Sequence, residues 1–149
     1  MLVAALLLAQ SAAPQCAVPD GNLPPSLAGW TRPAEDLAPG GAVVVDTGDT
    51  AKLSGVPAGA KAGRGAMIGF RVARAGRYGV ALDQAGWIDV VAGTSGGVKI
   101  ASVAHGHGPA CSTVRKIVSF DLAPGVYRLY LTGLATPRAK VMLVPAPDR

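Results

Sequence analysis

The segment FRVARAGRYGVAL, residues 70–82, carries the pattern that decides the fold. Large apolar side chains alternate with small or polar ones on both sides of Ala75-Gly76. Alternation with a period of two places one face of a strand in the core, and glycine favours the tight turn of a hairpin. The segment therefore predicts two antiparallel strands, each with one buried face.

Similar segments recur along the chain, separated by glycine- and proline-containing turn sequences. The candidate strands are 42–46, 50–53, 67–73, 77–82, 87–91, 98–103, 115–121, 126–132 and 139–144. The 20 glycines and 12 prolines argue against a helical bundle, because a glycine costs roughly 1 kcal/mol and a proline roughly 3 kcal/mol inside a helix. About nine short strands in 149 residues predict one all-β domain, a single antiparallel β-sandwich of jelly-roll-like type.

The N-terminal third divides into two segments. Residues 1–13 combine an apolar run with the small residues Ser11-Ala12-Ala13, which is typical of a signal peptide. Export to the periplasm or secretion is therefore predicted, with no membrane-spanning segment after cleavage. Residues 14–40 hold six prolines and predict an extended arm pinned by Leu27 and Trp30. The sandwich then occupies residues 41–149.

The two cysteines, Cys16 and Cys111, are predicted to form a disulfide. An isolated pair is normally bridged in an oxidising compartment. A bridge closing a loop of about 95 residues contributes roughly 4 to 5 kcal/mol in the chain-entropy model. It would tie the proline-rich arm to the loop that carries the histidines.

The net charge of +5 favours anionic partners such as a bacterial envelope surface. Nucleic acid is not indicated, since the lysines and arginines are scattered and the seven aromatic residues are too few for a stacking platform. The predicted partners are a small molecule, a glycan or an envelope component. The alternative is that these basic side chains are solvated surface charges without a specific partner.

The segment HGHGPAC, residues 105–111, holds both histidines of the chain. His105 and His107 are spaced i, i+2, so on an extended backbone both imidazoles point to one side and can share a metal. A third ligand would come from Asp83, Asp89 or a reduced Cys111, and the set would suit zinc, copper or iron. The alternative is a glycine-shaped turn in which the imidazoles bond to backbone carbonyls.

A second group of candidate binding residues lies around a bend between two strands. Trp87 with Asp83, Gln84 and Asp89 can bind a sugar, the indole stacking on the ring and the polar groups bonding to hydroxyls. Alternatively, Trp87 packs in the core and Asp83 is a turn residue.

Two basic residues and two serines complete the candidates. Arg115 and Lys116 are a possible anion clamp, or else solvated charges at a strand end. Ser112 and Ser119 lack the surroundings of a nucleophile, so no catalytic residue is assigned.

Residues 66–132 resemble secreted bacterial sandwich modules of the pre-peptidase C-terminal type. The resemblance rests on the segments Ala75-Gly-Arg-Tyr78, Ile88-Asp-Val90 and Pro124-Gly-Val-Tyr127, together with Phe70. It implies an accessory or binding domain that has no active site of its own.

The motif HGHGPACSTVRK, residues 105–116, together with AGWIDV, residues 85–90, is similar to a group of small exported α-proteobacterial proteins. Members of that group are often labelled homogentisate 1,2-dioxygenase, an activity that implies non-haem iron held by two histidines and a carboxylate. Two functions are therefore expected. The first is a non-catalytic binding module with a ligand or metal site at the His105/His107 loop. The alternative is a metal-dependent oxidoreductase that uses the same histidine pair.

Overall fold

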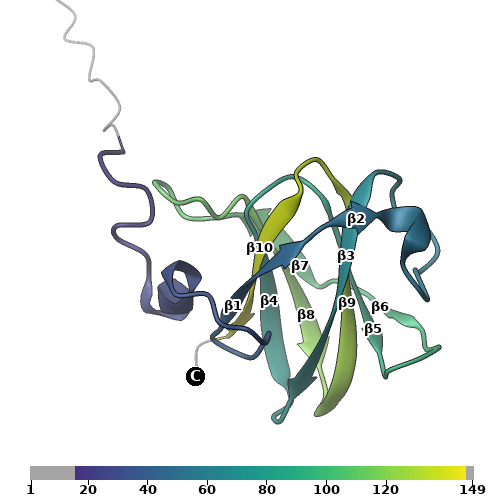
Figure 1. Ribbon diagram of the computed structural model, residues 1–149. Coiled ribbons are helices and arrows are strands. Elements are labelled where there is room, and N and C mark those ends of the chain that lie inside the picture. The colour runs from purple at the N-terminus through teal and green to yellow at the C-terminus, as the bar shows by residue number, and fades with distance from the viewer. Residues whose placement is uncertain (1–15, 147–149) are drawn as a thin grey trace, which may run out of the picture.

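The computed structural model describes residues 16–146, so the predicted signal peptide lies outside the described residues. Two five-stranded antiparallel sheets pack face to face (Figure 1). The predicted all-β sandwich is confirmed.

Each sheet takes strands from both halves of the chain. The first sheet, called sheet A, has the order β1 (Ala42–Asp46), β10 (Arg138–Pro145), β4 (Gly76–Leu82), β8 (Lys116–Leu122), β7 (Ala104–His107). The second, sheet B, has the order β2 (Gly48–Asp49), β3 (Arg64–Val72), β9 (Gly125–Leu134), β5 (Trp87–Ala92), β6 (Lys99–Ile100). The chain crosses between the sheets at the connections β1–β2, β3–β4, β4–β5, β6–β7, β8–β9 and β9–β10. The hairpin predicted around Ala75-Gly76 is therefore wrong, because β3 and β4 belong to different sheets and do not pair with each other.

The main core lies between the two sheets. The inward residues predicted from residues 70–82 are all buried, with exposed fractions of 7% or less. The rings of Phe70 and Tyr127 stack with centroids 5.4 Å apart, and the fully buried Leu129 and Leu131 of β9 belong to the same cluster. Burial of such side chains supplies the principal stabilisation of a sandwich.

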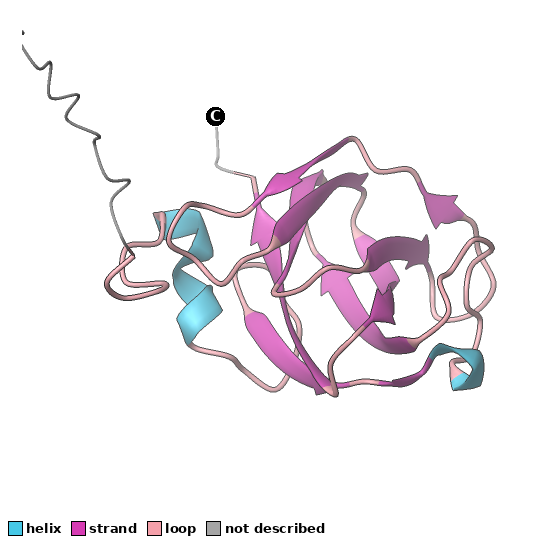
Figure 2. Ribbon diagram, turned by 90° about the horizontal axis from the view of Figure 1, so that it is seen from above, coloured by secondary structure: helices cyan, strands magenta, loops and turns pink. Residues whose placement is uncertain are grey.

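The proline-rich arm is not extended throughout, because residues Pro25–Thr31 form a 3₁₀ helix, η1. Pro25 is at its first position, where the fixed φ of proline favours a helical turn. Leu27 and Trp30 are buried, as predicted. They pack on the outer face of sheet A, where Met142 belongs to the same second hydrophobic cluster, and Figure 2 shows η1 beside the strands. No helix within residues 16–146 has the length and apolar character needed to cross a membrane.

Three predicted segments differ from the structure. Residues 50–53 were expected to form a strand, but Thr50–Lys52 is a short 3₁₀ helix, η2. Its turn is capped by Asp49, whose carboxylate accepts a hydrogen bond from the Ala51 amide at 2.9 Å. The strand expected at 98–103 is reduced to the two-residue β6. In contrast, the histidines lie on strand β7.

The disulfide between Cys16 and Cys111 is present, with the two Cα atoms 5.3 Å apart. Hydrogen bonds reinforce this link. The Asp20 carboxylate accepts from the Thr113 amide at 2.7 Å and from its hydroxyl at 2.5 Å. The Trp30 indole nitrogen donates to the same hydroxyl at 2.9 Å. The arm and the loop between β7 and β8 are therefore one hydrogen-bonded unit.

Candidate functional site

Trp87 lies on the outer face of sheet B. Along β5, Ile88 and Val90 point into the core, which leaves Trp87 and Asp89 on the opposite face. The exposed fraction of Trp87 is 56%, whereas that of Trp30 is 0%. The expectation that Trp87 packs in the core is therefore wrong, and more than half of its surface is exposed to solvent.

Lys61 lies over this indole, with its Nζ atom 4.6 Å from the ring centroid. The Lys61 amide donates to the Thr132 hydroxyl at 3.1 Å, which fixes the loop against the strand that pairs with β5. Gly133 allows this close approach: its φ is +64°, and an added Cβ would lie 3.1 Å from Lys61 Cβ and 3.4 Å from Trp87 Cδ1. The 56% exposure of Trp87 is measured with Lys61 in place.

Asp89 and Lys99 extend the same surface. Lys99 Nζ lies 3.7 Å from an Asp89 carboxylate oxygen and donates to the Ala58 carbonyl at 3.1 Å. We call the four residues Lys61, Trp87, Asp89 and Lys99 the Trp87 patch. It combines an exposed aromatic ring, two ammonium groups and one carboxylate that is largely buried beside Lys99.

The two lysines of the Trp87 patch were not identified from the sequence. Lys61 comes from the loop before β3, and Lys99 comes from the short strand β6. Neither segment has a hydrophobic periodicity or a sequence motif that would predict contact with Trp87. Only the pairing of β5 with β6 and β9 brings these side chains together.

His105 and His107 lie on β7 at the edge of sheet A. Both are exposed, and their register with Val118 and Lys116 places them on one side of the strand. Among residues 16–146, neither imidazole hydrogen-bonds to a protein group, contrary to the turn interpretation. The disulfide removes Cys111 from the candidate ligands.

Within this same span, no three His, Cys, Asp or Glu side chains are grouped to hold a metal ion. Asp89 is instead paired with Lys99 in the Trp87 patch. Asp83 directly follows β4, and its amide donates to the Lys140 carbonyl at 3.2 Å. Metal binding by His105, His107, Asp83 and Asp89 stays a prediction.

The other predicted ligand-binding residues surround the turn that precedes Trp87. The Lys116 ammonium donates to the Gly86 carbonyl at 2.6 Å, and the Arg115 amide donates to the Leu82 carbonyl at 2.8 Å. The Arg115 side chain is exposed. These contacts join the start of β8 to the β4–β5 turn and so hold the backbone next to Trp87.

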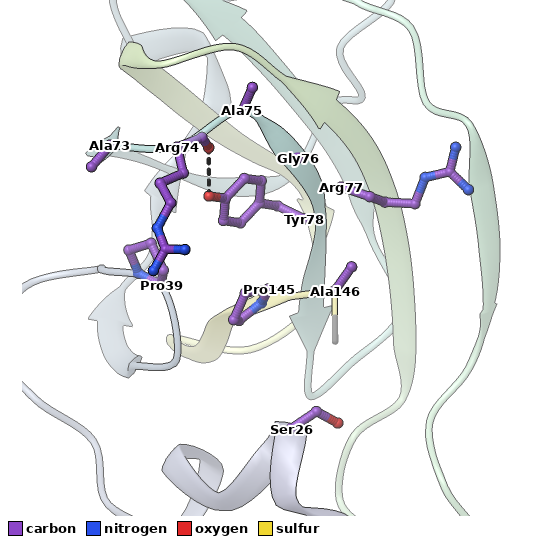
Figure 3. A pocket seen from close by; sticks show the side chains of 10 residues that line it. All are labelled: Ser26, Pro39, Ala73, Arg74, Ala75, Gly76, Arg77, Tyr78, Pro145 and Ala146. Atoms are coloured by element: carbon purple, nitrogen blue, oxygen red, sulfur yellow. Dashed lines mark hydrogen bonds between the residues drawn. The ribbon is translucent and has the colours of Figure 1, made fainter. Parts of the chain in front are cut away.

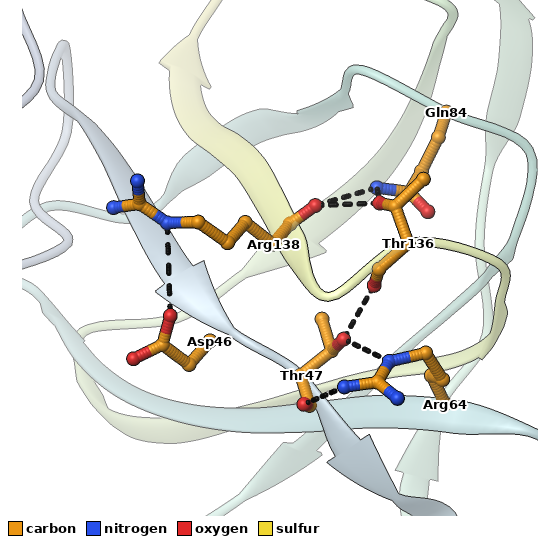
Figure 4. Close-up of polar contacts among 6 residues, drawn as sticks. All are labelled: Asp46, Thr47, Arg64, Gln84, Thr136 and Arg138. Carbon is orange, nitrogen blue, oxygen red and sulfur yellow. Dashed lines mark hydrogen bonds and ion pairs between the residues drawn. The ribbon is translucent and has the colours of Figure 1, made fainter.

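Gln84 belongs to a polar network at the same end of the sandwich (Figure 4). Its amide nitrogen donates to the Thr136 hydroxyl at 2.8 Å and to the Arg138 carbonyl at 3.1 Å. In the same network, the Arg64 guanidinium donates to the Thr47 hydroxyl at 2.8 Å. Gln84 therefore links the β4–β5 turn to the β9–β10 turn, and its polar atoms face the protein.

The structure thus brings two of the predicted residues, Trp87 and Asp89, onto one face of sheet B. The histidines lie on the edge strand of the other sheet, and Gln84 and Lys116 brace the turn next to Trp87. Comparisons with protein-family models, curated proteins and solved structures found no match.

Proposed function

We propose that this chain is an exported, non-catalytic binding module that holds an acidic oligosaccharide on the Trp87 patch. The observation that carries the proposal is the exposed indole of Trp87 with the Lys61 ammonium 4.6 Å from its centroid. Tryptophan is enriched at binding interfaces, because its ring combines a large apolar surface with a polar N–H group. The rest of the patch supplies the complementary polar groups.

The chemistry of the patch suits a sugar ring. An indole provides a flat apolar surface that matches the C–H face of a pyranose, while nearby donors and acceptors bond to its hydroxyl groups. Asp89 supplies acceptors, and Lys61 and Lys99 supply donors. The two lysines against one carboxylate, in a chain with a net charge of +5, favour a ligand that carries carboxylate groups.

The surroundings of the patch support a preorganised site. Trp87 follows a turn that is held by Lys116 and Gln84, and Gly133 packs against its ring edge. A rigid binding surface loses less conformational entropy when a ligand binds. Export accords with the Cys16–Cys111 disulfide, since such bridges persist in oxidising compartments.

The proposal is tested by isothermal titration of the protein with hexagalacturonate. Trp87→Ala is expected to weaken binding at least tenfold, which corresponds to about 1.4 kcal/mol. Lys61→Ala should weaken it less and should reduce its dependence on salt. Met67→Ala is the matched control, because Met67 is also an exposed apolar residue, 42% exposed, on the outer face of sheet B.

Two further results decide between versions of the proposal. Maltohexaose, which has no carboxylates, should bind more weakly than hexagalacturonate if the lysines recognise charge. Equal binding of both sugars would remove the acidic preference and leave stacking alone. Wild-type affinity in Trp87→Ala, or no saturable binding of either sugar, would contradict a sugar site on the Trp87 patch.

A further inference from the structure

The outer face of sheet A is covered over only part of its area. Helix η1 packs there against Ala81 and Met142 in the second hydrophobic cluster. Beyond the helix, the outward side chains of Ile117, Ser119 and Val144 remain partly exposed. A hollow of about 230 Å³ lies over these three residues.

A larger hollow of about 810 Å³ adjoins the first (Figure 3). Both are lined by Ser26 of η1, by Arg77 and by Pro145-Ala146 at the end of β10. The larger hollow is also lined by the β3–β4 turn, residues 73–75, by Gly76 at the start of β4, and by Pro39 of the arm. We call the two hollows together the arm groove.

The floor of the arm groove is largely apolar. Ile117, Val144 and Pro145 contribute its aliphatic surface. Gly79 lies between Ile117 and Val144, where an added Cβ would be 2.8 Å from Ile117 Cγ2 and 3.6 Å from Val144 Cβ. Because Gly79 has no side chain, these two can lie close to the sheet and leave the space above them open.

The two arginines of the groove differ in their partners. Arg77 points away from the larger hollow (Figure 3) and forms two hydrogen bonds with the Asp121 carboxylate, at 2.9 and 3.2 Å. These bonds lower the pKa of Asp121 below its ordinary value, so the pair stays charged but is neutral in sum. Arg74, in contrast, takes part in none of the ion pairs found among residues 16–146.

The backbone of Arg74 is held in place beside the groove. Figure 3 shows its side chain beside Pro39 at the edge of the larger hollow. The Tyr78 hydroxyl donates to the Arg74 carbonyl at 2.7 Å, which fixes the backbone of the β3–β4 turn. A guanidinium is therefore presented at one end of an apolar floor.

We propose that the arm groove is a second binding site, which takes a small amphiphilic carboxylate. The apolar part of the ligand lies over Ile117, Val144 and Pro145, and its carboxylate pairs with Arg74, whose planar guanidinium matches a carboxylate in bidentate geometry. The larger hollow, at about 810 Å³, falls within the range of roughly 300 to 1,000 Å³ that is typical of small-molecule sites. The site lies on sheet A and does not depend on the Trp87 patch of sheet B.

Dodecanoate, used below its micelle concentration, is the probe for isothermal titration of the full chain. Arg74→Gln is expected to weaken binding about tenfold or more, because a charge-assisted hydrogen bond is lost. Arg74→Lys should retain part of the affinity, since it keeps the charge without the bidentate geometry. Arg71→Gln is the matched control, an exposed arginine of β3 on the outer face of sheet B, and should bind like the wild type.

Competing amphiphiles and the Trp87→Ala variant complete the test. Dodecyltrimethylammonium should bind at least tenfold more weakly than dodecanoate, because Arg74 repels a cationic head group. Trp87→Ala should retain full affinity for dodecanoate, which separates this site from the proposed sugar site. Equal affinity in Arg74→Gln and wild type, equal binding of the cationic amphiphile, or no saturable binding of dodecanoate would overturn the proposal.

Discussion

Arg128 is a buried cation on the outer face of sheet B, with an exposed fraction of only 6%. Its guanidinium donates to the Gly93 carbonyl at 2.9 Å, to the Gly96 carbonyl, and to the Tyr130 hydroxyl at 3.2 Å. The Tyr130 hydroxyl in turn donates to the Ser54 carbonyl at 2.8 Å. This one residue therefore joins the β5–β6 turn to the loop after η2.

At the residue scale we predict that Arg128→Met lowers the free energy of unfolding by about 2 to 4 kcal/mol, because it leaves buried carbonyl groups without donors. Urea denaturation followed by circular dichroism measures the change. The exposed Arg71→Met should change stability by no more than about 0.5 kcal/mol. Equal stability of the two variants would show that the Arg128 hydrogen bonds are not important for the fold.

At the scale of elements, the alternation in residues 70–82 was sufficient to predict β4 and the end of β3. Its apolar positions repeat over several residues, and their burial outweighs local preferences. Residues 104–107 lack this signal, because β7 is an edge strand with four exposed residues, and pairing with β8 alone makes it a strand. Likewise, the exposure of Trp87 follows from which face of β5 packs against sheet A, a tertiary contact that single-sequence periodicity does not contain.

Helix η1 is attached to sheet A mainly through Trp30. We predict that Trp30→Ala lowers the free energy of unfolding by about 3 to 5 kcal/mol, the usual cost of removing a fully buried aromatic side chain. The variant also loses the hydrogen bond to Thr113. Trp87→Ala provides the contrast, since an exposed side chain should cost no more than about 0.5 kcal/mol. Similar losses in both variants, measured by urea denaturation, would contradict the assignment of Trp30 as the buried anchor.

At the scale of the whole molecule, the disulfide connects the arm to the sandwich across a sequence separation of 95 residues. We predict that Cys16→Ala/Cys111→Ala lowers the free energy of unfolding by up to about 4 to 5 kcal/mol. Hydrogen exchange should show faster exchange in the arm, while the β3, β4 and β9 amides stay protected. Unchanged exchange in the arm would show that Asp20, Thr113 and Trp30 hold it without the bridge.

Predictions from the sequence are most accurate at this largest scale. The cysteine pair predicted the bridge, and the strand pattern predicted the sandwich, because both depend on residue types that have few structural alternatives. The two proposed binding sites were harder to predict. Lys61 and Lys99 lie near Trp87 only after three segments of the chain have assembled into sheet B. The arm groove depends on where η1 packs on the outer face of sheet A.

The most direct test of the proposed sugar site is a titration of ¹⁵N-labelled protein with hexagalacturonate, monitored through the indole N–H signals in NMR spectra. The chain has two tryptophans, one fully buried and one exposed, so each signal reports on one location. We predict a saturable shift of the Trp87 signal, assigned through Trp87→Phe, while the Trp30 signal stays in place. An unmoved Trp87 signal at saturating sugar would contradict a binding site on the Trp87 patch.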